Sequence, residues 1–221
     1  MTKPTILTSD QELLLSALAH EKDITSSFYL SGGTALAEFY LHHRLSEDLD
    51  FFSEEEVDSA GLSALIKKVS AGTGITEVTF ETSFNRNLFF VRMAHSVVKT
   101  EFTYYPFPRI EPGLAYGALA VDSILDIAVN KVFTISQKPR SRDFIDLYCI
   151  LKERSEWSIE ALVLKAKAKF DHHIDPLQLS AQCLKATELK DFPTMKIPLE
   201  EKEWQDFFVG VAKRLAQSQL A

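Results

Sequence analysis

The sequence has little cysteine, no long apolar run and no excess of basic charge. Its two cysteines, Cys149 and Cys183, are too few for a disulfide framework or for a zinc site built from cysteine. No apolar run reaches the roughly 18–20 residues that span a bilayer. The first residues lack the basic start and apolar core of a secretory signal. We therefore expect a cytoplasmic protein with no membrane association.

What the chain does contain is the ordinary mixture of a globular protein, with 46% hydrophobic and 25% charged residues over 221 positions. This length fits one large domain or two small ones. The net charge of −7 is uneven, because residues 1–60 hold twelve acidic and three basic residues, whereas the remainder holds 19 acidic and 21 basic residues. The acidic first part of the chain is therefore either a solvated surface or the position of a metal site.

The spacing of apolar residues, glycine and proline predicts two parts. In the first part we expect short strands at 27–30, 48–52, 76–82, 87–95 and 96–105, with helices around 10–18, 35–41 and 58–71. Prolines and glycines between 106 and 117 predict a domain boundary, which we place between 115 and 116. Beyond it the pattern is helical at about 121–136, 141–153, 157–169, 176–187 and 200–216. We thus predict an α/β (α+β) fold, with a mixed sheet and flanking helices in residues 1–115 and a C-terminal helical bundle in residues 116–221.

A glycine pair follows the first predicted strand, in the sequence Ser31-Gly32-Gly33-Thr34. Glycine lets the backbone approach a ligand without a Cβ in the way. The start of a helix at the same place directs backbone N–H groups and the positive end of the helix dipole at a phosphate. Tight strand–helix turns also need glycine for structural reasons alone, so the pair by itself leaves both interpretations open.

Two aspartates, Asp48 and Asp50, lie at alternate positions of the next predicted strand. In a strand, residues two apart project from the same face. Two carboxylates held side by side repel each other unless a cation lies between them, and Mg²⁺ prefers such oxygen ligands. A third carboxylate should come from a neighbouring strand, where spacing alone does not separate Glu101 from Glu77 or Glu81. Two metal ions held by three carboxylates would suit an in-line phosphoryl transfer.

A basic stretch begins in the predicted helical part, where residues 131–142 contain no acidic residue and four cations: Lys131, Lys138, Arg140 and Arg142. Such a stretch suits a triphosphate or an RNA backbone. Lys131 could point outward or into a cleft between the two parts. Asp143 and Asp146 share one face of the next helix. Asp143 could pair with a cation, orient Lys131 or accept the proton of an incoming hydroxyl.

Together these motifs resemble the AbiEii/AbiGii toxin family of nucleotidyltransferases, within the DNA polymerase β-like nucleotidyltransferase superfamily. The resemblance covers roughly residues 28–152. It rests on Gly32-Gly33-Thr34-Ala35-Leu36, on His43-Arg44-x-Ser46-x-Asp48-Leu49-Asp50-Phe51-Phe52, and on Lys131 with Arg142-Asp143-Phe144-Ile145-Asp146-Leu147-Tyr148.

The resemblance implies a metal-dependent transfer of a nucleotide from a nucleoside triphosphate to an acceptor hydroxyl, on tRNA or on a protein. It implies Mg²⁺ or Mn²⁺ held by Asp48, Asp50 and Glu101, with Lys131 and Asp143 among the catalytic residues. The nucleotide phosphates would meet Ser31, Gly32, Gly33, Thr34, Lys131 and Arg142. It also implies the toxin of a toxin–antitoxin or phage-defence pair, with an antitoxin protein as a partner. Two alternatives are a nucleotide-binding module without turnover and a housekeeping nucleotidyltransferase.

Overall fold

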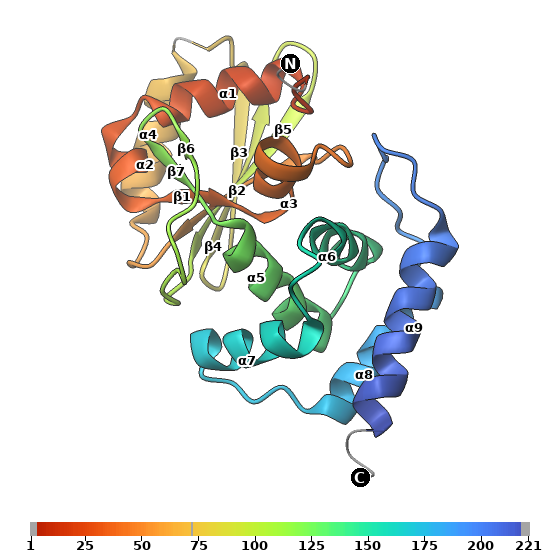
Figure 1. The fold of residues 1–221 in the computed structure, drawn as a ribbon. Helices are drawn as coiled ribbons and strands as arrows, with labels where there is room; N and C mark the ends of the chain where they lie inside the picture. The colour runs from red at the N-terminus through yellow and green to blue at the C-terminus, as the bar shows by residue number, and fades with distance from the viewer. Residues whose placement is uncertain (1–3, 72, 218–221) are drawn as a thin grey trace. The chain divides into compact units, whose positions relative to one another are not determined.

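A mixed sheet organises the first half of the chain (Figure 1). The computed structural model describes residues 4–71 and 73–217, and these contribute seven strands in the order β3-β4-β5-β2-β1-β7-β6. β2 lies centrally, parallel to β5 and antiparallel to β1. The strands are β1 (Tyr29–Ser31), β2 (Asp48–Ser53), β3 (Glu77–Ser83), β4 (Arg86–Arg92), β5 (Val97–Tyr104), β6 (Ala115–Tyr116) and β7 (Leu119–Val121).

The alternation of side chains along β2 separates an apolar face of the sheet from a polar one. Leu49 and Phe51 are fully buried on one face, whereas Asp48 and Asp50 are half-buried on the other. On the apolar face the ring of Phe51 stacks on Phe102 of β5, with ring centroids 4.8 Å apart. Burying each such ring is worth roughly 1.5–3 kcal/mol. The core therefore fixes the face to which the two carboxylates point.

Four helices accompany this sheet: α1 (Ser9–Ala19), α2 (Lys22–Ser27), α3 (Gly32–Leu36) and α4 (Ser59–Ser70). A π-helical turn, η1 (Ala37–Leu41), continues α3. α1 begins with a capping box in which the side chains and backbones of Thr8 and Gln11 bond reciprocally. Helical spacing brings Leu14 and Leu18 of α1 and Leu62 and Ile66 of α4 into the core.

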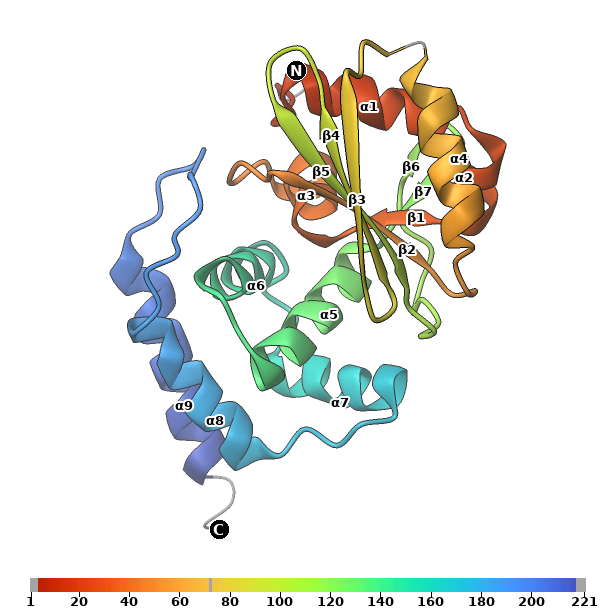
Figure 2. The same cartoon turned by 180° about the vertical axis from the view of Figure 1, so that it is seen from behind.

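The second half is helical and forms a core of its own. Its elements are α5 (Ile124–Gln137), α6 (Ser141–Glu153), α7 (Ile159–Phe170), α8 (Pro176–Leu184), the 3₁₀ turn η2 (Lys185–Thr187) and α9 (Glu201–Gln217). α8 and α9 lie side by side (Figures 1 and 2). The ring of Phe144 on α6 meets Phe208 of α9 at 4.8 Å. A mixed sheet followed by a helical bundle is therefore confirmed as the fold. No helix in the described part of the chain is both long and apolar enough to cross a membrane.

The chain divides into two compact units later than the boundary we place between residues 115 and 116. Unit 1 contains the residues through Pro108 and Pro112–Ser123, and unit 2 contains Arg109–Glu111 and the residues from Ile124 onward. β6 and β7 belong to unit 1 because β7 pairs in parallel with β1. Strands of two and three residues are too short to show an alternation that the sequence pattern could reveal.

Candidate active site

The three predicted carboxylates lie on one face of two neighbouring strands. Asp50 of β2 is the register partner of Glu101 on β5, and Asp48 is the partner of Lys99. On the other side of β2, Asp50 is paired with Ser31 of β1. Register partners point to the same face of a sheet. The sheet therefore brings Ser31, Asp50 and Glu101 into one row across three strands.

The glycine turn lies directly against Asp50. Gly32 has a φ of +73°, which is the left-handed region, and a Cβ on it would overlap Oδ2 of Asp50. A Cβ on Gly33 would overlap Nη2 of the buried Arg44. The hydroxyl of Thr34 donates a hydrogen bond to the backbone carbonyl of Asp48. A side chain at either glycine would therefore displace Asp50 or Arg44, and the predicted phosphate turn lies directly against the aspartate pair.

Two cations that sequence reasoning missed neutralise these carboxylates. Nζ of Lys99 donates to Oδ2 of Asp48 at 2.9 Å. Arg86 of β4 binds Glu101 in a bidentate pair, with Nε at 2.6 Å from Oε1 and Nη2 at 2.5 Å from Oε2. The hydroxyl of Thr103 donates to Oε1 of Glu101 at 2.7 Å. Burial alone would raise the pKa of Glu101, but the hydrogen bonds from Arg86 and Thr103, together with the positive charges of Arg86 and Lys99, hold that pKa below its ordinary value.

The residues of this face fit a divalent cation at two of the three predicted ligands. Asp48 and Asp50 carry hard carboxylate oxygens at alternate positions on the same face; each has a partner within the described chain, which for Asp48 is Lys99. Glu101 differs, because Arg86 engages both of its oxygens. Among residues 4–71 and 73–217, no three histidine, cysteine, aspartate or glutamate side chains are grouped so that they could hold a metal ion as they stand. A bond from Glu101 to a metal ion would have to form beside the guanidinium that already engages both of its oxygens.

A further buried carboxylate, Asp122, follows β7 on the same side of unit 1. The hydroxyl of Ser31 donates to its Oδ2 at 2.7 Å, and its N–H donates to the carbonyl of Leu30 at 2.8 Å. The hydroxyl of Tyr40 donates to its carbonyl oxygen, also at 2.8 Å. Sequence reasoning missed Asp122 because it assigned residues from 121 onward to a helix. The strand before it, Leu119–Val121, is too short for the sequence pattern to separate it from the start of a helix.

The remaining predicted site residues belong to unit 2. Lys131 on α5 is buried, and its Nζ donates to Oδ1 of Asp143 and to Oδ2 of Asp146, each at 2.8 Å. Asp143 also accepts a hydrogen bond from the backbone N–H of Arg140 at the start of α6. Arg142 is half-buried on the same helix. Of the roles considered for Asp143, the structure shows the pair with Lys131.

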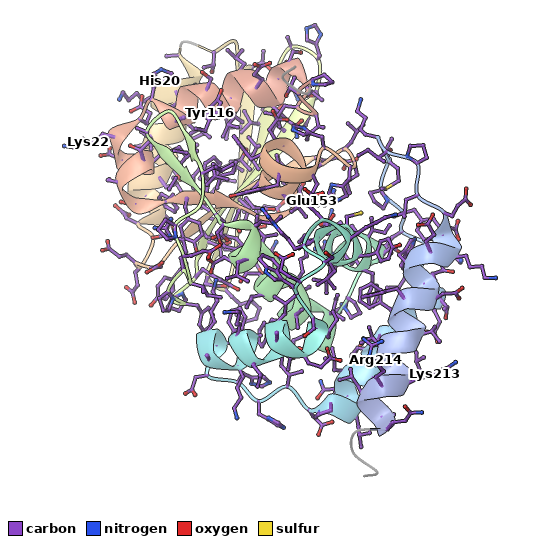
Figure 3. All side chains as sticks on the ribbon, viewed as in Figure 1. His20, Lys22, Tyr116, Glu153, Lys213 and Arg214 are labelled. Carbon is purple, nitrogen blue, oxygen red and sulfur yellow. The ribbon has the colours of Figure 1, made fainter. Side chains whose placement is uncertain are left out.

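Two hollows in unit 1 lie away from these residues. One, of about 450 Å³, is lined by the end of α1, the start of α2 and the β6–β7 turn, and includes His20, Lys22 and Tyr116 (Figure 3). The other, of about 300 Å³, lies between α2 and α4. The described residues that line them include none of the predicted site residues.

Comparison with known proteins gives one family and a shared fold. The family model described as "Nucleotidyl transferase AbiEii toxin, Type IV TA system" matches residues 13–217. An uncharacterized protein of Aquifex aeolicus (strain VF5), aq_aa25, is 31% identical over 151 residues, which is 66% of this chain and 68% of that protein.

Two crystal structures from Helicobacter pylori resemble most of the chain. One is of a candidate nucleotidyltransferase, with a TM-score of 0.62 and 18% identity over 96% of this chain and 97% of that one. The other is of JHP933, with a TM-score of 0.60 and 18% identity over 94% and 90% of the two chains. At this identity, the likeness shows a common fold.

Proposed function

The chain belongs to the AbiEii family of nucleotidyl transferase toxins, and from this premise we propose that it transfers a nucleotide from a nucleoside triphosphate to an acceptor hydroxyl with the help of a divalent metal ion. One observation carries the proposal for this chain's own residues. The Gly32-Gly33 turn lies directly against Asp50. The proposed phosphate-binding backbone is therefore next to a proposed metal ligand.

In the proposed reaction, the acceptor hydroxyl gives up its proton to water as its oxygen attacks the α-phosphorus; a new P–O bond forms, and the bond from the α-phosphorus to the oxygen that bridges to the β-phosphate breaks to release pyrophosphate. Asp48 and Asp50 would hold Mg²⁺ or Mn²⁺, which when bound neutralises charge on the phosphate oxygens. The missing side chains at Gly32 and Gly33 let Asp50 and Arg44 lie directly against the turn, and the backbone N–H groups of the turn are proposed to bind the phosphates. The hydroxyls of Ser31 and Thr34 already donate to other groups, so they serve by fixing the turn.

The residues of unit 2 are proposed to assist in binding the nucleotide. Lys131 is held between Asp143 and Asp146, which fixes the position of its ammonium group. We assign Lys131 and Arg142 to the triphosphate and Asp143 to positioning Lys131. Replacing Lys131 with methionine should therefore weaken nucleotide binding, whereas Asp143→Asn should do so by a smaller factor, because Asp146 keeps one carboxylate on the lysine.

A labelling assay tests the activity. Purified protein is mixed with Mg²⁺ or Mn²⁺, each α-labelled nucleoside triphosphate, and either total RNA or total protein. We expect transfer of label by the wild-type protein and loss of transfer in Asp48→Ala and Asp50→Ala. Glu77→Gln is the matched control, because Glu77 is an exposed carboxylate of β3 that pairs with Arg92. Absence of transfer with every nucleotide, or transfer that is unchanged in Asp50→Ala, would overturn the catalytic proposal.

The family also motivates a proposal for the biological role: a toxin that acts on a cytoplasmic acceptor, tRNA or protein, and that is paired with an antitoxin. Expression of the protein should arrest growth, and Asp50→Ala should relieve the arrest. Arrest that persists in this variant would contradict a toxic role of the transfer reaction. Tight binding of a triphosphate without any labelled product would instead favour a nucleotide-binding module without turnover.

A further inference from the structure

The hydrogen bonds on Glu101 leave it poorly suited to bind a metal ion. Its Oε1 accepts from Nε of Arg86 and from the hydroxyl of Thr103, and its Oε2 accepts from Nη2 of Arg86. A carboxylate has about four acceptor positions, two on each oxygen, so three are in use and Oε1 is saturated. The side chain is only 8% exposed. A metal ion would find only the one remaining acceptor position on Oε2, in a nearly buried place beside a guanidinium of the same charge sign.

Arg86, in contrast, is open to a ligand. Its side chain is 46% exposed, although its partner Glu101 is almost buried. Arginine carries five N–H donors, and the contacts of Arg86 with the described chain use one on Nε and one on Nη2. Glu101 therefore orients the guanidinium while the donors on its other edge point away from the pair. A planar, oriented guanidinium is the side chain best matched to phosphate oxygens.

The position of Arg86 also places it near the aspartates. Its register partner is Thr103, which shares a face of β5 with Glu101. The charges of Asp50 and Asp48, after Glu101 itself, help to raise the pKa of Arg86. The positive charges of Lys99 and Arg86 on this face, with the buried Arg44 against the Gly33 turn, favour a triphosphate beside the carboxylates.

We propose that Glu101 is a positioning residue that holds Arg86, and that Arg86 binds the phosphates of the nucleotide through the N–H groups that Glu101 does not use. The metal ion is then held by Asp48 and Asp50, without Glu101. This inference rests on the proposed function, because it names a phosphate ligand within the same site. It differs from the role that the family resemblance implies for Glu101.

Metal binding and nucleotide binding are measured separately on purified full-length protein. The first readout is Mn²⁺ affinity, taken from the electron paramagnetic resonance signal of unbound Mn²⁺. The second is the affinity for a nucleoside triphosphate in EDTA, taken by calorimetry, so that no metal contributes. The variants are Asp50→Asn, Arg86→Gln, Glu101→Gln and the double variant Arg86→Gln with Glu101→Gln. Arg92→Gln is the control, since Arg92 lies on the same strand in an exposed pair with Glu77. Circular dichroism confirms that each variant folds.

The double variant is decisive, because it removes one positive and one negative charge together and leaves the charge of the face unchanged. We expect its Mn²⁺ affinity to stay within about twofold of wild type, while Asp50→Asn loses at least about tenfold. We expect both variants that lack Arg86 to bind the triphosphate about tenfold more weakly or worse, and Arg92→Gln to bind it normally. If the double variant loses Mn²⁺ affinity as Asp50→Asn does, Glu101 is a metal ligand and the inference is wrong, although the proposed function stands. If wild-type protein binds Mn²⁺ but no triphosphate in EDTA, or if the variants that lack Arg86 bind the triphosphate as wild type does, the inference is wrong; if wild-type protein binds neither probe, the inference and the proposed function both fail.

Discussion

The close approach of Gly32 to Asp50 predicts a specific defect in Gly32→Ala. Gly32, Gly74 and Gly117 all have positive φ values, of +73°, +70° and +60°. A Cβ at Gly74 or Gly117 would meet nothing within 4 Å, whereas a Cβ at Gly32 would overlap Oδ2 of Asp50 and lie 3.2 Å from its Cβ and Cγ. The three alanine variants therefore share the backbone strain, and only Gly32→Ala adds the collision.

The size of the difference follows from these contacts. Left-handed backbone costs an L-residue roughly 1–2 kcal/mol, so Gly74→Ala and Gly117→Ala should each lose about that much stability. Overpacking adds about 1–3 kcal/mol at Gly32, because the backbone of Asp50 is held by its pairing with Ser31 and Glu101. The side chain of Asp50 must then turn aside. A displacement of about 1 Å in a reacting group can cost about 100-fold in rate.

Urea unfolding followed by circular dichroism measures the stability, and the labelling assay measures the transfer. We expect Gly32→Ala to be less stable than both controls and to lose about 100-fold in transfer. The controls should transfer at nearly the wild-type rate. If Gly32→Ala matches Gly117→Ala in both measurements, the turn does not press on Asp50 and the reasoning from close approach is refuted.

Three further predictions concern buried groups. Lys169 and Asp126 form an ion pair at 2.7 Å, and their side chains are 1% and 0% exposed. Lys169→Met should therefore lower the free energy of unfolding, measured in urea, by about 3–5 kcal/mol. A decrease of less than about 1 kcal/mol would contradict this. The pKa of Glu101 is lower in the folded protein than in the unfolded chain, where it is about 4.3. The ionised carboxylate therefore stabilises the fold fully above about pH 4.3, and this stabilisation is lost as the pH falls through the folded-state pKa. The difference in unfolding free energy between wild type and Glu101→Gln should therefore narrow from neutral pH towards about pH 3, and widening would refute the assignment. Burial raises the pKa of Cys183 to about 12. At about pH 8 a thiol reagent should therefore label the half-buried Cys149 before Cys183. Rapid labelling of both thiols in the native protein would be inconsistent with the burial of Cys183.

The aspartate pair could be predicted from the sequence because its signal is local. Alternation with apolar residues in β2 was enough to place Asp48 and Asp50 on one face. The choice among Glu101, Glu77 and Glu81 depended on which strand pairs with β2, and spacing does not contain that information. The structure places Glu101 beside Asp50, whereas Glu77 and Glu81 lie exposed on β3 at the edge of the sheet.

The groups that sequence reasoning missed depend on contacts between distant segments. Arg86 and Lys99 look like solvated charges on strands, and only the register of β4, β5 and β2 brings them to the carboxylates. Asp122 is 91 residues from Ser31, to which it is hydrogen-bonded. The family and fold that the motifs predicted are confirmed, whereas the metal ion, the acceptor and the toxic role stay predictions.

The path of the chain between Arg109 and Ser123 restricts how the protein can be divided. Arg109–Glu111 belongs to unit 2, where the N–H groups of Ile110 and Glu111 donate to Asp126. A fragment that starts at Ile124 would lack these donors to a buried carboxylate. A fragment that starts at Arg109 would carry β6 and β7 without their neighbour β1. Cutting the chain at a single position therefore cannot yield two intact units. To separate them, residues 112–123 would have to stay with unit 1, and a new linker would have to join residue 111 to residue 124 in unit 2.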